Sequence, residues 1–187
     1  MQHLNRFALL ATALFFACTL NAQSYTKGQT DLHVGIGLIS TWYASGLDGV
    51  IPPINASFEK AVTDNIGVGG FVGFSTAKYD YDGYGYDYKW NFNYIMFGGR
   101  GTYHFKVLDD SKWDTYAGLT LGYYIANANF KSDDPEINED LYDAPADSDL
   151  GWSAFAGTRY QFSEKLGVYG ELGYGFSVFN IGLHWKL

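Results

Sequence analysis

The sequence predicts an all-β protein, an eight-stranded antiparallel up-and-down β-barrel. The main observation is that eight segments alternate apolar residues with polar or small ones, which is the period of a strand whose two faces have different surroundings. A second observation is that the connections between these segments are mostly either short or long, in alternation. The third is composition: 19% of the residues are aromatic, and 23 glycines accompany only 4 prolines, which favours strands and tight turns.

The predicted strands cover most of the chain after residue 29. Their ranges are 30–40, 53–62, 66–77, 89–105, 113–127, 150–162, 166–175 and 177–187. The connections at 63–65, 106–112 and 163–165 are short, the one at 175–177 is very short, and those at 41–52, 78–89 and 128–149 are long. Strands joined in this way form successive hairpins, so each strand is expected to pair with its neighbours in the sequence.

Residues 1–22 are predicted to be a cleaved signal peptide. Arg6 supplies positive charge, the run from Phe7 to Leu20 is apolar, and Ala22 precedes Gln23 at a cleavage point. Residues 23–187 then form a single barrel domain. An uncleaved anchor helix and lipidation at Cys18 are the alternatives for this segment.

Cysteine content and charge exclude several functions. Cys18 is the only cysteine and leaves with the signal, so disulfide frameworks, thiolate zinc sites and cysteine nucleophiles are not expected. The chain carries 20 acidic and 12 basic residues, a net charge of −8. Nucleic acid is therefore not an expected partner, because binding it depends on neutralising phosphates with Lys and Arg.

Alternation alone does not say which set of residues faces outward. A soluble secreted ligand-binding barrel would turn its apolar set inward. Here the polar set consists mainly of Gly, Ser and Thr with a few charges, which suits a crowded interior. Aromatic residues also fall near one rim, where an interfacial girdle would lie: Tyr103, Phe105, Trp113, Tyr160, Phe162 and Trp185. We therefore expect a transmembrane β-barrel whose apolar set faces lipid.

The end of the chain resembles the C-terminal signal strand of bacterial outer-membrane barrels. The matching residues are Gly182, Trp185 and Leu187, and the last departs from the phenylalanine that such strands most often carry. Together with the signal peptide, the eight strands and the loop lengths, this strand makes the chain similar to the small outer-membrane β-barrel family that includes the membrane domain of OmpA, OmpX and the opacity-type adhesins.

That resemblance implies several partners and a location. It implies a monomer in the cell outer membrane, in contact with outer membrane lipids, and assembled by the barrel-assembly machinery through the C-terminal strand. It also implies a structural, envelope-integrity or adhesion role in which the extracellular loops bind a ligand whose identity is unknown.

Four charged residues fall on the inward set, namely Glu59, Arg100, Arg159 and Glu171. An eight-stranded barrel has an interior just wide enough for side chains, and charges buried there must be paired. We therefore predict an interior ion-pair network, which either plugs the lumen or lines a gated ion path. The residues Asp31, His33, His104 and His184 are candidates to extend this network towards the rims.

The predicted loops carry the candidates for surface binding. Between residues 79 and 88, tyrosines alternate with acidic residues and glycine, and they are Tyr79, Tyr81, Tyr84, Tyr86 and Tyr88. This stretch is either a stiff extension of two strands with an aromatic collar or a recognition surface, since Tyr offers large contact area with few rotamers. The acidic connection at 128–149 is expected to be extended and mobile, and able to collect cations or basic partner segments.

No enzyme is expected. His33 and His104 lie on the inward set, but no serine motif, metal-ligand cluster or cofactor motif accompanies them. Besides a surface-binding barrel, the alternatives are a small porin-like pore, a lipid A-modifying barrel enzyme and the soluble ligand-binding barrel.

Overall fold

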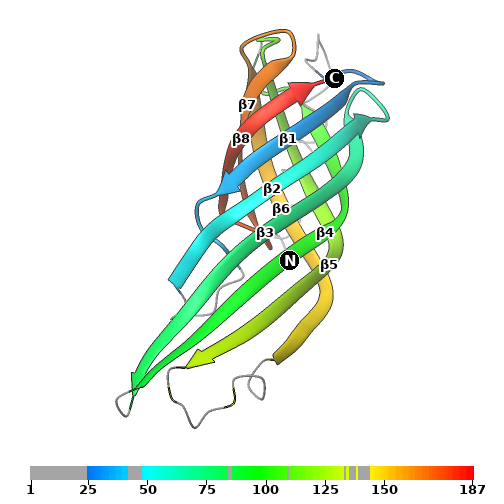
Figure 1. The fold of residues 1–187 in the computed structure, drawn as a ribbon. Helices are drawn as coiled ribbons and strands as arrows, with labels where there is room; N and C mark the ends of the chain where they lie inside the picture. Colours follow the sequence, from blue (N-terminus) through cyan, green and yellow to red (C-terminus); the bar gives the residue numbers. More distant parts are fainter. Residues whose placement is uncertain are drawn as a thin grey trace, which may run out of the picture.

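The computed structural model describes residues 25–41, 48–83, 86–108, 110–132, 134, 138 and 144–187. Its eight strands are β1 (Thr30–Gly37), β2 (Asp48–Ala61), β3 (Ile66–Gly83), β4 (Tyr86–Phe105), β5 (Trp113–Ser132), β6 (Ala144–Gln161), β7 (Leu166–Tyr174) and β8 (Phe179–Lys186). They close into one barrel in sequence order, with every neighbouring pair antiparallel and β1 paired with both β2 and β8 (Figure 1). The predicted fold is confirmed; the predicted signal peptide, 1–22, lies outside the described residues.

The two walls of the barrel differ as the alternation predicts. Large apolar side chains on the outer wall are strongly exposed, as at Leu121 (67%) and Leu172 (62%). The residues between them point inward and are polar or small, so that Thr120 and Glu171 are buried. The exterior is thus apolar, whereas the interior holds the buried polar and charged side chains together with some aromatic ones, and the face assignment made from the sequence is confirmed. Among the described residues, no helix is long and apolar enough to cross a membrane.

The three connections predicted to be long are shorter than predicted, because each contains strand residues. β2 begins at Asp48, inside the predicted loop 41–52. The stretch 78–89 is a hairpin in which β3 and β4 stay paired as far as Gly83 and Tyr86, so the alternative that it extends two strands is confirmed. In the third, 128–149, β5 runs on to Ser132 and β6 begins at Ala144. The strands were cut short because they were identified by apolar residues on the outward set, and beyond Ile95 and Ile125 the outward residues are polar.

The projecting part of the sheet, which we call the β3–β5 extension, comprises residues 79–83 of β3, 86–93 of β4 and 127–132 of β5. Figure 1 shows these strands running on past the ends of β1, β7 and β8, away from the barrel end where the C-terminus lies. The first paired residue of β2, Asp48, lies opposite Lys78, and that of β6, Ala144, lies opposite Ala128. Most of the extension therefore has three strands rather than a closed wall.

Along the extension the alternation continues with its chemistry reversed. The last apolar pair on the outer wall is Ile95 with Ile125. Beyond it the outward residues are polar: Asn93, Asn91 and Lys89 on β4, and Asn127, Asn129 and Lys131 on β5. The inward residues are aromatic instead: Tyr79, Tyr81, Tyr88, Trp90, Phe92 and Phe130. A strand that leaves an apolar environment for water should show this exchange, because its outer face then contacts water.

Candidate functional site

Arg159, on β6, is the centre of a cluster of charges in the half of the barrel nearest the C-terminus. Its side chain is almost wholly buried. The guanidinium lies 2.5 Å from Asp114 on β5, 3.0 Å from Asp31 on β1 and 4.0 Å from Glu59 on β2. Its Nη1 also lies 3.3 Å from Nε2 of His33. One guanidinium thus bridges strands on opposite sides of the lumen, and such a buried charge is tolerable only with partners of this kind.

Two histidines complete the ion-pair cluster. Both ring nitrogens of His104 face carboxylates, with Nδ1 2.9 Å from Asp114 and Nε2 3.0 Å from Glu59. Nε2 of His184 lies 3.0 Å from Asp31. Each of the three carboxylates around Arg159 therefore has at least two partners. The histidines and Asp31 extend the cluster as their place on the inward set suggested.

Tyr25 covers this cluster from the segment that precedes β1. It is fully buried, and its ring stacks on that of His104 with centroids 3.6 Å apart and an interplanar angle of 8°. Gly28, with φ of 90°, turns the chain back towards β1, and its amide donates to the carbonyl of Ala61. The amide of Lys27 donates to the side chain of Asp64. Residues 25–29 therefore form a tethered lid over one end of the lumen.

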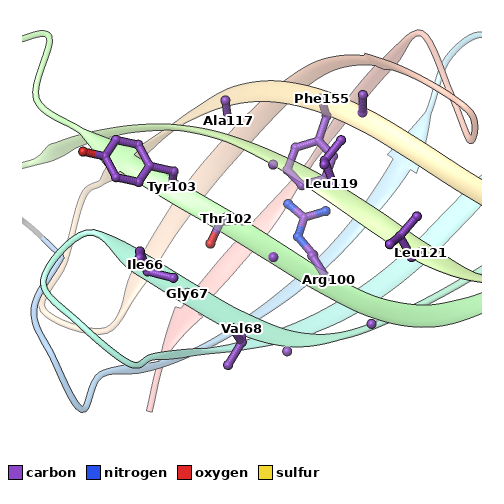
Figure 2. Close-up of a pocket in the computed structure, with 15 residues that line it drawn as sticks. Ile66, Gly67, Val68, Arg100, Thr102, Tyr103, Ala117, Leu119, Leu121 and Phe155 are labelled. Atoms are coloured by element: carbon purple, nitrogen blue, oxygen red, sulfur yellow. The ribbon is translucent and has the colours of Figure 1, made fainter. Parts of the chain in front are cut away.

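A second, smaller group of charges lies towards the middle of the barrel. Arg100 on β4 forms a buried ion pair with Glu171 on β7, and the hydroxyl of Tyr116 donates to the same carboxylate at 2.9 Å. The guanidinium lies 3.8 Å from the centre of the Phe155 ring, a cation–π contact visible in Figure 2. The ion pair and the hydroxyl of Tyr116 together connect β4, β5 and β7.

Beyond Arg100 the lumen is filled by apolar side chains. Phe71, Met96 and Phe176 form a buried cluster, with Tyr124 packed against it. The rings of Phe71 and Phe176 meet edge to face with centroids 5.0 Å apart. The inward position of Phe71 explains why it interrupts the apolar pattern of its strand. A lid, two charge groups and an aromatic plug thus follow one another along the lumen.

The four charges predicted to form one network divide between two groups. Arg100 pairs with Glu171, while Arg159 and Glu59 lie 4.0 Å apart in the other group. Sequence reasoning missed Asp114, although alternation from Tyr116 places it on the inward set. It also missed Tyr25, which lies outside the strands, so no alternation pattern includes it.

Thr102, His104 and Asp114 form a hydrogen-bonded chain of hydroxyl, imidazole and carboxylate, the arrangement that hydrolases use to activate a nucleophile. Thr102 Oγ1 lies 3.0 Å from Nε2 of His104, but it also donates to Glu59 at 2.6 Å. All of these side chains are buried beneath Tyr25. The described residues also include no group of three or more His, Cys, Asp or Glu side chains able to hold a metal ion.

The outer wall carries a shallow apolar groove over β3, β4 and β5 (Figure 2). It is flanked by Ile66, Val68, Tyr103, Leu119 and Leu121, and Gly99 and Gly101 form its floor. A Cβ added at Gly101 would meet nothing within 4 Å. Most of its lining belongs to the apolar exterior, although the lumen residues Arg100, Thr102 and Phe155 also contribute to it.

The aromatic residues of the β3–β5 extension form a connected ladder across three strands. Tyr79 lies opposite Trp90 and Tyr81 opposite Tyr88, each pair with ring centroids 6.2 Å apart, and Trp90 contacts Phe130 at 4.6 Å. Tyr79 and Tyr81 remain 40% and 49% exposed. Of the other predicted recognition residues, Tyr84 lies outside the described residues, and only the backbone of Tyr86 is described. Most of the acidic stretch 133–143 is likewise outside them.

At the closing seam of the barrel, Tyr169 of β7 packs over Gly182 of β8. The two residues are register partners, and a Cβ at Gly182 would lie 2.7 Å from Cε1 of Tyr169. The tyrosine hydroxyl donates to Asn55 on β2 at 3.0 Å, so the ring reaches across β8 and β1. Of the other residues of the predicted C-terminal signal, Trp185 pairs with Leu32 and Leu166, and the amide of Leu187 donates to Thr30.

Comparison with known proteins gives one family. A family model described as outer membrane protein beta-barrel domain matches residues 8–184. No curated protein matches the chain. Three solved structures are similar: the N-terminal β-barrel domain of Pseudomonas aeruginosa OprF (14% identity, TM-score 0.49, 86% of this chain and 98% of that one), OprG from the same organism (13%, 0.49, 89% and 99%), and the attachment invasion locus protein Ail of Yersinia pestis, in complex with the heparin analogue sucrose octasulfate (12%, 0.46, 86% and 96%).

Proposed function

Because the chain belongs to the outer membrane protein β-barrel domain family, we propose that it spans the cell outer membrane and acts by surface recognition through the β3–β5 extension. In this proposal the side chains that fill the lumen stabilise the barrel, and the protein is neither a pore nor an enzyme. The observation that carries the proposal is the exposed aromatic ladder around Tyr79 and Tyr81, at the barrel end remote from the C-terminus.

The apolar outer wall supports the membrane placement. Side chains such as Leu119, Leu121 and Leu172 are more than half exposed, and they recur along β5 and β7. Exposing this apolar surface to water would be unfavourable, whereas lipid tails would cover it without that free-energy cost. In the outer membrane the short turns at 62–65 and 162–165 then face the periplasm, and the extension faces the outside.

The contents of the lumen argue against a pore. Tyr25 is fully buried at one end, with the ion pairs of Arg159 next to it. The ion pair of Arg100 follows towards the middle, and Phe71, Met96 and Phe176 pack together beyond it. A conducting path would have to separate these contacts in series. The same burial withholds the Thr102–His104 pair from any substrate, which supports the non-enzymatic part of the proposal.

The aromatic ladder supports recognition of an extracellular ligand. Tyrosine and tryptophan combine large contact area, few rotatable bonds and a polar edge, which is why binding surfaces are rich in them. The ladder is carried by paired strands, so its rings are already positioned before a ligand arrives. An adhesive or envelope-stabilising role follows if that ligand lies on another cell or within the envelope.

We also propose that the C-terminal strand engages the barrel-assembly machinery and that the mature protein is a monomer. Gly182, Trp185 and Leu187 fit the signal strand of the family, and β8 is the strand that closes the barrel against β1. A closed sheet leaves no open edge along the barrel through which copies would pair.

The experiment compares cells displaying the wild type with cells displaying Tyr79→Ser/Tyr81→Ser. Binding is measured to a panel of immobilised matrix proteins and glycans. The matched control is Lys78→Ser/Asp80→Ser, which alters the outer face of the same strand and removes the ion pair between these two side chains. Heat-dependent gel mobility checks that every variant folds. Binding by the wild type and the control, with loss in the tyrosine variant, supports the proposal. No wild-type binding across the panel, or equal binding by all three, contradicts it.

A further inference from the structure

The outer face of the β3–β5 extension carries three successive cross-strand pairs of identical residues. Asn93 lies opposite Asn127, Asn91 opposite Asn129, and Lys89 opposite Lys131. They follow directly after the last outward apolar pair, Ile95 with Ile125. All of these polar side chains are exposed except that of Asn93, which is half-buried. We call this set the Asn–Lys ladder.

The ladder places two lysines side by side: Lys89 lies opposite Lys131 on β5, whereas on its other side it lies opposite Asp80 of β3. Side chains directly opposite one another on an antiparallel pair have Cβ atoms about 5 Å apart, and like charges in that position destabilise the pair. Lys89 has an ion pair of 3.6 Å with Asp87 on its own strand, at an exposed site where such a pair contributes little. Lys131 forms no ion pair among the described residues, which leave out most of the acidic stretch 133–143 that follows it. An anion placed between the two ammonium groups would relieve the repulsion.

Composition makes the absence of acidic residues from the ladder informative. The chain has 20 acidic and 12 basic residues, so an ordinary solvated strand face here would be expected to carry more carboxylates than amines. The six positions of the ladder hold two lysines, four asparagines and no carboxylate, and the nearest described carboxylates on this outer face, Asp80 and Asp87, both border Lys89 and not Lys131. The amide groups add hydrogen-bond donors beside the two cations. This is a face suited to oxygen-rich anions.

We call the apolar part of the outer wall, which ends at Ile95 and Ile125, the apolar belt. The height of the ladder above this belt fits the position of a lipid headgroup. Six residues separate Ile95 from Lys89, which is about 20 Å along a strand at ~3.4 Å per residue. With a strand tilt of about 45° this is about 14 Å along the membrane normal. The asparagine pairs lie nearer to the belt, at about 5 and 10 Å. Lysine stems several ångströms long can bring their ammonium groups back towards the membrane.

We propose that the Asn–Lys ladder binds the anionic phosphate headgroup of a lipid in the leaflet from which the extension emerges. The two lysines hold the phosphate, and the asparagine amides donate to the oxygens of the same headgroup. The extension then has two distinct faces, an aromatic one towards the barrel axis and a lipid-binding one away from it. This inference rests on the membrane placement proposed above, because only that placement brings headgroups to the ladder.

The test compares lipid binding by the wild type and by Lys89→Gln/Lys131→Gln. Each barrel is refolded in neutral maltoside micelles and titrated with short-chain phosphatidylglycerol or phosphatidylcholine, and bound lipid is counted by native mass spectrometry. The matched control is Lys112→Gln/Lys165→Gln, which removes two exposed lysines at the other end of the barrel. At about 1 kcal/mol per lysine, and about 1.4 kcal/mol for each factor of ten, we expect the ladder variant to bind phosphatidylglycerol about thirtyfold more weakly. The control should bind like the wild type.

A second variant, Lys89→Arg/Lys131→Arg, keeps both charges and should retain phosphatidylglycerol binding. High salt should weaken wild-type binding, because exposed charges are screened. Equal phosphatidylglycerol affinity in the wild type and the ladder variant would overturn the inference, as would an equal loss in the control. Heat-dependent gel mobility on the same samples separates the two proposals. A band shift without selectivity for phosphatidylglycerol would contradict the headgroup site alone, whereas the absence of a band shift would contradict the membrane barrel itself.

Discussion

The ring of Tyr25 lies flat on the imidazole of His104, with centroids 3.6 Å apart, and joins the segment before β1 to the charge cluster inside the barrel. The hydroxyl reaches Gly67, where a Cβ would leave it no room. The guanidinium of Arg159 lies 5.1 Å from the centre of the same ring. A residue outside the strands therefore completes the packing of the lumen at one end.

Tyr25→Ala should lower the free energy of unfolding by about 3–5 kcal/mol, because the substitution removes a fully buried aromatic ring and leaves a cavity. Tyr25→Phe keeps the stacking and should cost much less. Guanidinium unfolding of the refolded barrel, followed by tryptophan fluorescence, measures both. An unchanged stability for Tyr25→Ala would show that the lid is not bound in the lumen.

Arg159→Met should destabilise the barrel by about 3–5 kcal/mol, because it leaves Asp31, Asp114 and Glu59 buried without their shared cation. Arg159→Lys keeps the charge but cannot bridge three strands, so its stability should fall between those of Arg159→Met and the wild type. The same unfolding measurement applies. Equal stabilities for Arg159→Met and the wild type would mean that these carboxylates do not depend on the guanidinium.

Gly182→Val should weaken the seam between β8 and its neighbours, since its side chain would occupy the space of the Tyr169 ring. Overpacking of this kind costs about 1–3 kcal/mol or more. Gly101→Ala is the matched control, because a Cβ there meets nothing within 4 Å, and it should leave stability unchanged or slightly raised. A cost at Gly101 as large as that at Gly182 would mean that the loss reflects glycine itself rather than the contact.

The position of the apolar belt can be measured with a charge scan. Leu172→Arg places a cation on the outer wall near its middle and should cost about 2–4 kcal/mol in lipid, falling to about 0–1 kcal/mol for Asn91→Arg on the extension. Unfolding in vesicles rather than micelles is the appropriate measurement. Similar costs at the two positions would contradict the reversal of the outer face beyond Ile95.

The sequence predicted the fold and the faces well because the relevant signal is local. Alternation distinguishes Leu121 from Thr120 without knowledge of any distant contact, and the structure places one outside and the other inside. The same criterion failed on the extension, where the outward residues become Asn91 and Lys89. Strand pairing there continues through aromatic contacts such as Tyr79 with Trp90, which an apolar-outward rule does not recognise.

The candidate site was predictable only in part, for a different reason. Alternation identifies which residues point inward, so Arg100 and Glu171 were available as partners. It does not say which inward residues meet across the lumen, because that depends on strand tilt and register. Asp114 and Asp31 reach the same guanidinium from strands that are far apart in the sequence. The stacking of Tyr25 on His104 depends on a turn at Gly28 that brings the segment back into the barrel.

The most direct test of a membrane barrel with a filled lumen is the current across a planar lipid bilayer containing the refolded protein. Incorporation is verified on the same preparation by heat-dependent gel mobility and by protection of the strands from protease. The lid, the ion pairs of Arg159 and Arg100, and the Phe71–Met96–Phe176 cluster predict a bilayer that stays silent at moderate voltage. Discrete, reproducible conductance steps from the wild type would contradict this account and make the lumen the functional site.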